Sequence, residues 1–273
     1  LIVTNKKDQK GFIKIGNERV VEARLNDAEF FWNKEKTHNL VKKISELKTM
    51  NFFKGLGTYF DKVQRMRKLG GIVSDELLIS KEKVELSASI CKTDLTSDLV
   101  GEFPELQGLM GGYFSAHQGF DKDISLALTE HYLPIGLNSK VPKKPFSVAL
   151  SITDKIDTIV GFFGINEKPT SSKDPFALRR IALSIIRITI ENKKNFKIND
   201  LLNYALNLYE DQSLNLSNKN LQKELYDFFR DRFKYYLKEK EIRYDIIDAS
   251  ISSFSLNSLY SSFEKARCLN KII

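Results

Sequence analysis

Residues 92–113 read KTDLTSDLVGEFPELQGLMGGY, an acid-bearing helical stretch that runs into Phe103-Pro104 and then into a glycine-rich turn. This stretch continues an apolar pattern with helical spacing that begins upstream, at Val84, Ala88, Cys91, Leu95 and Leu99. The pattern predicts one long helix over about 81–100, ended by Gly101 and Pro104. Closely spaced glycines after it indicate turns and tightly packed helices.

Helical periodicity extends along most of the chain, and only 14 glycines and 6 prolines interrupt it. It predicts further helices over about 17–32, 37–46, 59–69, 123–132, 146–163, 198–209 and 220–240, one that starts at Asp174-Pro175, and a last one from about 244. Gly70-Gly71 is expected to stop the helix that precedes it. Residues 1–16 alternate weakly, which predicts the end of a strand. The expected fold class is therefore mainly all-α, with a short strand remnant at the N-terminus.

Composition limits the classes of function. The formal charge of +8 and the pI near 9.2 favour a polyanionic partner, although a lysine-rich solubilising surface has the same charge. Cys91 and Cys268 form no C-x-x-C motif, which argues against a zinc or redox site and suits a reducing cytosol. No apolar run approaches the roughly 20 residues of a membrane span, so a cytoplasmic protein without a membrane partner is expected.

Four stretches of the sequence resemble the β subunit of bacterial glycyl-tRNA synthetase. Besides residues 92–113, they are Gly16-Asn17-Glu18-Arg19-Val20 with 23–31, Glu130-His131-Tyr132-Leu133-Pro134, and Ser172-Lys173-Asp174-Pro175-Phe176-Ala177-Leu178-Arg179-Arg180. They occur in the family's order across most of residues 16–190. The family's β subunit is longer, so the resemblance implies an internal piece, without the amino-terminal modules and most of the anticodon-binding domain.

The resemblance also implies a domain organisation. Residues 1–48 would be a connecting segment, and residues 49–166 a helical domain similar to the HD phosphohydrolase superfamily. Residues 167–273 would be a second helical bundle that leads into a truncated anticodon-binding domain. The sequence favours the second boundary independently, since loop-forming residues cluster there: Gly164, Pro169, Ser171 and Ser172.

In the HD superfamily an adjacent His-Asp pair, an upstream His and a downstream Asp hold a metal that activates water. By position, Lys92 and Asp94 fall where the His-Asp pair would be, and Asp154 where the last Asp would be. His131 is a further candidate, and His117 and Asp157 invite the same hypothesis. No His-Asp pair occurs in the chain, and a lysine would add positive charge where a cation must bind. We therefore expect no metal site and no catalytic residue here.

Two further features leave alternatives open. Asp94 and Asp98 would share one face of the predicted helix, as an acid/base pair, as metal ligands, or simply facing water or arginines. The stretch from Phe103 to Gly108 is either a rigid connector fixed by Pro104 or a recognition loop. In the second case Glu105 and Gln107 would hydrogen-bond a nucleotide edge or a partner loop.

Two basic clusters are candidates for contact with RNA. One cluster lies on a short predicted helix and consists of Lys62 and Arg65, with Arg67 and Lys68 beside them. The other cluster surrounds the predicted helix start at Asp174-Pro175 and consists of Lys173, Arg179, Arg180 and Arg187. A helix N-terminus flanked by basic side chains can bind phosphate through backbone N–H groups and charge. The alternative is surface charge, or arginine–carboxylate pairs inside a helical bundle.

No P-loop or glycine-rich nucleotide fingerprint occurs, and three histidines support no Ser-His-Asp or Cys-His arrangement. The resemblance likewise places the class II active site, ATP and Mg on an α subunit. It implies that this chain is a non-catalytic, tRNA(Gly)-binding portion of a heterotetrameric glycine–tRNA ligase, without a cofactor of its own. Its expected partners are the α subunit and tRNA(Gly), and not DNA. An HD-type metal-dependent phosphohydrolase and a structural scaffold for α/β subunit assembly remain as alternatives.

Overall fold

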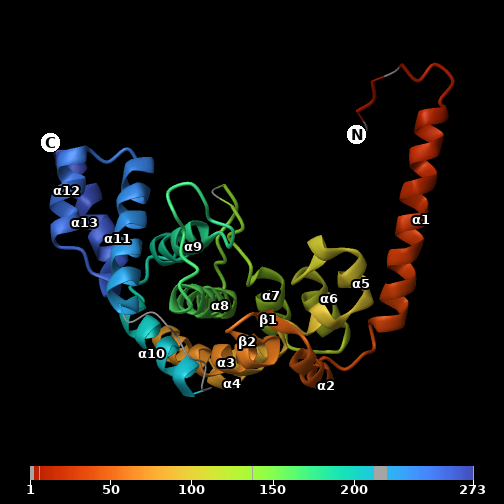
Figure 1. Ribbon diagram of the computed structural model, residues 1–273, viewed down its shortest axis with the longest axis horizontal. Helices are drawn as coiled ribbons and strands as arrows, with labels where there is room; N and C mark the ends of the chain where they lie inside the picture. The colour runs from red at the N-terminus through yellow and green to blue at the C-terminus, as the bar shows by residue number, and fades with distance from the viewer. Residues whose placement is uncertain (1–2, 6, 137, 212–219, 273) are drawn as a thin grey trace.

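The computed structural model describes residues 3–5, 7–136, 138–211 and 220–272. Within them it contains thirteen α-helices and one small antiparallel sheet, formed by β1 (Asn51–Phe53) and β2 (Gly57–Thr58). The elements form a curved arrangement, with α1 (Phe12–Glu35) at one end and α11 (Leu221–Glu239), α12 (Tyr244–Ser252) and α13 (Leu259–Ile272) at the other (Figure 1). The expectation of a mainly helical chain is confirmed. None of the described helices combines the length and apolar character needed to cross a bilayer.

The described residues before Phe12 form turns and irregular backbone and residues 12–16 are helical, so the predicted strand remnant is not found among the described residues of 1–16. Helix α1 begins at Phe12, directly after Gly11 with φ 71°, and Asp8 caps it by accepting the backbone N–H of Lys14 (2.9 Å). Weak alternation without a partner strand leaves the backbone N–H groups unpaired, whereas a helix pairs them internally. The C-terminal part of α1 packs against α5 (Asp98–Glu102), while its N-terminal part extends away from the other elements (Figure 1). The helix exposes large apolar side chains: Phe12, Val20, Val21, Leu25 and Phe30.

Residues 37–46, predicted as one helix, form α2 (Leu40–Lys43) and the start of a 3₁₀ turn, η1 (Ile44–Thr49). The next helix, α3 (Tyr59–Leu77), runs straight through Gly70-Gly71, so the predicted stop there is wrong. A Cβ on Gly70 would lie 3.0 Å from Val84 Cγ1, and one on Gly71 would lie 2.9 Å from Lys81 Cε. The two glycines therefore allow α3 and α4 (Lys81–Ile90) to approach closely rather than ending α3.

The predicted helix over 81–100 is divided into α4, η2 (Thr93–Thr96) and α5 (Asp98–Glu102). The break follows from side chains that hydrogen-bond the backbone in place of the helix. Ser97 Oγ accepts from Val100 N (3.1 Å), while Asp94 Oδ2 accepts from Gly108 N (2.5 Å) at the start of α6 (Leu109–His117). Asp94 is buried and Asp98 is exposed, so the two do not share a helix face as predicted.

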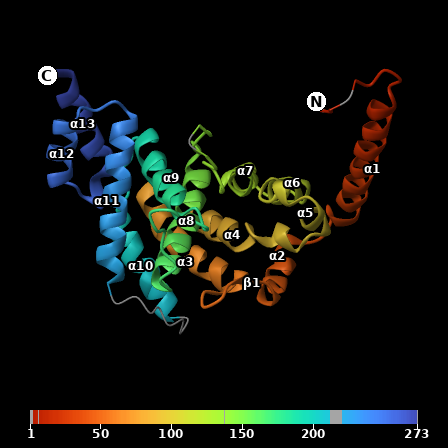
Figure 2. The ribbon, with the colours of Figure 1, turned by 45° about the horizontal axis from the view of Figure 1, so that its top comes forward.

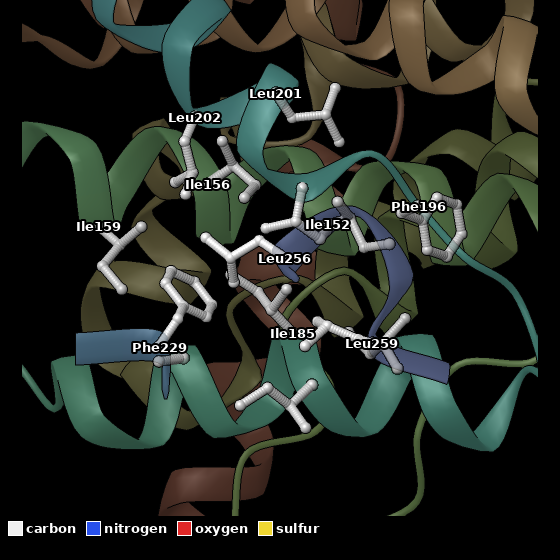
Figure 3. Packing of buried hydrophobic residues seen from close by; sticks show 14 of the residues in the cluster. Ile152, Ile156, Ile159, Ile185, Phe196, Leu201, Leu202, Phe229, Leu256 and Leu259 are labelled. Atoms are coloured by element: carbon white, nitrogen blue, oxygen red, sulfur yellow. The ribbon is translucent and has the colours of Figure 1, made fainter. Parts of the chain in front are cut away.

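Helix α8 (Pro145–Gly164) lies at the centre of the molecule and agrees with the prediction over 146–163. It packs against α3, α4, α7 (Lys122–Glu130), α9 (Leu178–Glu191), α10 (Ile198–Asp211) and α11. Figure 3 shows its Ile152, Ile156 and Ile159 meeting Ile185 of α9 and Phe229 of α11. The hydrophobic core is therefore continuous across the expected boundary at 166/167.

The C-terminal helices pack on this core. Instead of one final helix from Tyr244, the chain forms α12, a short turn η4 (Leu256–Ser258) and α13, which lie beside α11 at the C-terminal end (Figure 2). Both α11 and α13 contact α9. Helix α9 begins at Leu178 rather than Pro175. Asp174 still caps it, since its carboxylate accepts from Leu178 N (2.8 Å) and Arg179 N (3.0 Å). The polar loop predicted at 211–219 lies outside the described residues from 212 onward.

Candidate functional site

Helices α3, α8 and α10, with the ends of α4 and α7, bring together a group of buried polar side chains, here called the charge cluster. Its members are Lys62, Arg65, Lys92, His131, Asp154, Lys155, Asp157 and Tyr209. Asp154 and Asp157 lie one helical turn apart on α8, so both carboxylates face the same neighbours. Burying this many charges requires that each be paired.

Asp157 is held by two cations. Arg65 Nε lies 2.6 Å from its Oδ1, and Lys62 Nζ lies 3.0 Å from its Oδ2. The Arg65 guanidinium also stacks on the Tyr209 ring, 3.8 Å from the ring centroid, and Tyr209 Oη donates to the Asp157 carbonyl oxygen (3.1 Å). Burial alone would raise the pKa of the Asp157 carboxyl, but the charges of Arg65 and Lys62 outweigh burial and lower that pKa.

Asp154 is held by a second pair of cations. Lys62 Nζ lies 3.0 Å from its Oδ1, and Lys92 Nζ lies 3.1 Å from its Oδ2. Burial again acts to raise the pKa, and the charges of Lys62 and Lys92 hold the pKa of Asp154 well below its usual value. Both aspartates are therefore ionised at neutral pH.

Lys92 Nζ also lies 2.9 Å from His131 Nε2. The other ring nitrogen, Nδ1, is 2.6 Å from the carbonyl oxygen of Leu128. A carbonyl can only accept, so the proton is on Nδ1 and the Nε2 lone pair faces the ammonium. Burial, followed by the charge of Lys92, lowers the pKa of His131 well below its usual value, in agreement with a neutral ring.

Lys155 connects the charge cluster to the loop that follows α7. Its ammonium donates to the carbonyl oxygens of His131 (3.2 Å), Tyr132 (3.3 Å) and Leu133 (2.8 Å) and to Ser151 Oγ (2.8 Å). Burial, and then the positive charges of Lys92 and Lys62, lower the pKa of Lys155 to about 7. Lys155 thus fixes the backbone after His131 against α8.

Three of the four positions assigned from the HD resemblance converge here: Lys92, His131 and Asp154. Asp94 does not join them, because its carboxylate is bonded to the first turn of α6 through Gly108 N and Gly111 N (3.3 Å). Over the described part of the chain, no group of three or more His, Cys, Asp or Glu side chains is placed to hold a metal ion.

Acid is expected to destabilise the protein through these aspartates. A carboxylate whose folded-state pKa is lowered contributes stability above its unfolded pKa of about 3.9, and this contribution is lost as the pH falls through the folded-state pKa. The free energy of unfolding in urea should therefore drop steeply below about pH 4. Asp157→Asn should make that slope shallower by up to about 1.4 kcal/mol per pH unit. Equal slopes would contradict the pairing described above.

The structure corrects one of the predicted RNA-contacting clusters. Lys62 and Arg65 are only 2% and 1% exposed, and their charges are used by Asp154 and Asp157. The prediction that these two side chains contact RNA is wrong, because no phosphate can reach them. Arg187 is also occupied, by Glu191 Oε1 (2.8 Å) and the carbonyl oxygens of Gly136 (3.1 Å) and Ser139 (2.9 Å).

The remaining members of the second cluster lie at the surface. Lys173 and Arg180 are exposed, and Arg179 is half-buried and donates to the Thr170 carbonyl oxygen. They surround the start of α9, where the sequence predicts a phosphate contact.

A second basic group lies at the other end of α9 and was not predicted. Lys143 Nζ donates to the Glu191 carbonyl oxygen (2.6 Å), and Asn192 Nδ2 donates to the Pro142 carbonyl oxygen (3.1 Å). These bonds join the loop before α8 to the end of α9. They gather five exposed lysines, here called the lysine surface: Lys140, Lys143, Lys144, Lys193 and Lys194. In the sequence these five lysines appear only as Lys140 and two separate Lys-Lys pairs.

A cleft of about 520 Å³, lined by both apolar and polar side chains, lies between the charge cluster and the start of α9. Its lining includes Glu105, Gln107, Tyr132, Asp154 and Arg180. Three of the four stretches that carry the resemblance therefore meet at one place, although they are far apart in the sequence. Gly108 has φ 79°, and a Cβ there would lie 2.8 Å from Tyr132, so this glycine permits the contact between two of them.

Comparison with known proteins shows which family shares this sequence. Residues 1–252 match the family model described as glycyl-tRNA synthetase beta subunit. The chain is similar to glycine–tRNA ligase beta subunits from Clostridioides difficile (41% identity, 94% of the chain, 37% of that protein) and Rhodospirillum centenum (39%, 91% and 35%). The similarity to that of Lactobacillus acidophilus is comparable (38%, 90% and 36%).

The chain spans little more than a third of the length of these relatives. Both the family model and the relatives nevertheless cover almost all of the chain, including the charge cluster, the cleft beside it and most of the C-terminal helices. The chain therefore belongs to the glycyl-tRNA synthetase β-subunit family.

Proposed function

We propose that this chain is a non-catalytic, tRNA-binding portion of the β subunit of a two-subunit glycine–tRNA ligase in the cytoplasm. The α subunit would carry glycine activation with ATP and Mg, and this chain would help to hold tRNA(Gly). Within it, residues 49–166 would form the HD-like domain, residues 1–48 its connecting segment, and residues 167–273 the region toward the anticodon-binding domain.

The observation that carries the proposal is a basic strip along α9. Lys173, Arg179 and Arg180 lie at its start and the lysine surface at its end, and a helix of 14 residues separates them by about 21 Å. Among the described residues, neither Lys173, Arg180 nor any lysine of the lysine surface forms an ion pair with a carboxylate. The nearby Glu191 carboxylate is taken by Arg187. The strip therefore keeps its charge for a polyanion, and an RNA backbone spans such distances.

The scaffold alternative has one observation in its favour. Phe12, Val20, Leu25 and Phe30 of α1 are between 61% and 70% exposed, and such apolar surface is typical of protein packing. This surface lies on α1, away from α9 (Figure 1), so a role in assembly and a role in RNA binding are compatible.

The test is tRNA(Gly) affinity measured against salt in the complete two-subunit enzyme. Arg180→Ala, and a variant with Lys143, Lys144, Lys193 and Lys194 changed to Gln, should bind more weakly whatever the RNA sequence. Each lost phosphate contact should flatten the slope of log K against log salt by about 0.7–0.9.

A matched control removes the same charge from the C-terminal helices by changing four exposed lysines to Gln: Lys223, Lys238, Lys240 and Lys265. We expect this control to affect affinity much less than the α9 variants. Equal losses would mean that only net charge matters. Unchanged affinity and slope in the folded α9 variants would assign the strip to the scaffold role.

A further inference from the structure

The geometry of the charge cluster points to a cation site whose resident cation is a protein side chain. We propose that the Lys92 ammonium takes the place of the divalent metal that an HD-type centre would hold, so that the protein keeps a metal-site geometry without a metal. The observation is that His131 Nε2 and Asp154 Oδ2 both lie within 3.1 Å of one buried Nζ atom.

The histidine is oriented as a metal ligand would be. Metal-binding histidines usually donate their second ring N–H to a carbonyl or carboxylate, which turns the other lone pair toward the cation. His131 does this through Leu128, and its Nε2 lone pair faces Lys92. The Tyr132 ring lies 3.9 Å from the same ammonium, and its π face favours a cation there as well.

The residues present do not fit a divalent metal. One imidazole and one carboxylate are fewer ligands than zinc or the harder cations require. Oδ2 of Asp94, the third group by position, is bonded to the start of α6, and Oδ1 of Asp154 lies 3.0 Å from the Lys62 ammonium. A divalent ion would also meet the positive charges of Lys62 and Lys92. Lys92 therefore satisfies His131 and Asp154 and excludes the metal at the same time.

The proposal makes a prediction about removing the ammonium. Without the ammonium, no cation lies between His131 and Asp154. A histidine at position 92 would then add a third ligand and complete a transition-metal site. Lys92→His should therefore bind Co²⁺ or Zn²⁺, whereas the wild-type chain should not. Lys92→Met fills the space without charge or ligand, and it should be destabilised and insensitive to metal.

The experiment compares the wild-type chain, Lys92→His and Lys92→Met, after chelator treatment, with and without Co²⁺. Only Lys92→His should show Co²⁺ ligand-field absorption. Its unfolding midpoint should rise by roughly 5–10 °C at a Co²⁺ concentration about 100 times its Kd. The absorption should disappear in Lys92→His with His131→Ala. If Lys92→His is unfolded without metal, folding on addition of Co²⁺ supports the proposal equally.

Two outcomes would overturn it. One is stoichiometric, tight binding of Co²⁺ or Zn²⁺ by the wild-type chain, because the ammonium would then not occupy the site. The other is a Lys92→His chain that neither binds nor is stabilised by either metal. Neither outcome bears on RNA binding by α9, so this proposal and the proposed function fail separately.

Discussion

Replacing Arg65 with methionine is expected to lower the free energy of unfolding by about 3–5 kcal/mol, the usual cost of breaking a buried ion pair from one side. Asp157 would keep Lys62 as its cationic partner, and Tyr209 would lose the guanidinium that stacks on its ring. For a chain of this size the loss corresponds to a fall of about 6–20 °C in the unfolding midpoint. Thermal and urea unfolding would measure it.

The control lies half a helical turn away. Arg67 is on the same helix, but its side chain is 51% exposed and its partner is Glu85. Arg67→Met should therefore cost at most about 1 kcal/mol. Adding Asp157→Asn to Arg65→Met should restore part of the loss, because the uncompensated buried charge disappears. Equal effects of the two arginine substitutions would show that the charge cluster does not stabilise the fold.

A second large loss of stability is expected on substitution of Gly112, where α6 packs against α7. A Cβ there would lie 1.9 Å from Thr129 Oγ1 and 2.9 Å from the backbone oxygen of Ser125. The hydroxyl can rotate away, but the backbone oxygen cannot, so Gly112→Ala forces the two helices apart. We expect a loss of about 1–3 kcal/mol or more, despite the better helix propensity of alanine.

Gly101→Ala is the matched control, since a Cβ at this position of α5 would meet no neighbouring atom of the described residues within 4 Å. It should be neutral or stabilising by up to about 1 kcal/mol. Removing the Thr129 hydroxyl as well, with Thr129→Ala, should relieve only part of the Gly112→Ala loss. If Gly112→Ala is as stable as Gly101→Ala, the close crossing of α6 and α7 is not required.

The helices with an unbroken apolar stripe were predictable from the sequence. The ranges 146–163, 198–209 and 220–240 agree with α8, α10 and α11 to within two residues at each end. Periodicity failed where side chains bond the backbone, as Asp94 and Ser97 do between α4 and α5. It also failed at Gly70-Gly71, because the sequence does not distinguish a glycine that ends a helix from one that allows a neighbouring helix to pack closely.

The candidate site could be predicted only in part. Of the four positions that the resemblance assigned to one site, Lys92, His131 and Asp154 lie together in the structure and Asp94 does not. The burial of Arg65 depends on Asp157, which follows 92 residues later, and no local pattern distinguishes it from a surface arginine. The lysine surface likewise exists only because the loop before α8 folds back onto the end of α9.

The proposed role in tRNA binding requires that the basic strip along α9 face RNA. Amide hydrogen exchange of the complete two-subunit enzyme, with and without tRNA(Gly), tests this requirement directly. We predict slower exchange on tRNA binding in residues 135–144 and 173–194, and little change in α12 and α13. If tRNA(Gly) binds tightly and exchange over 135–144 and 173–194 stays the same, the RNA-facing surface is elsewhere and the proposed role is contradicted.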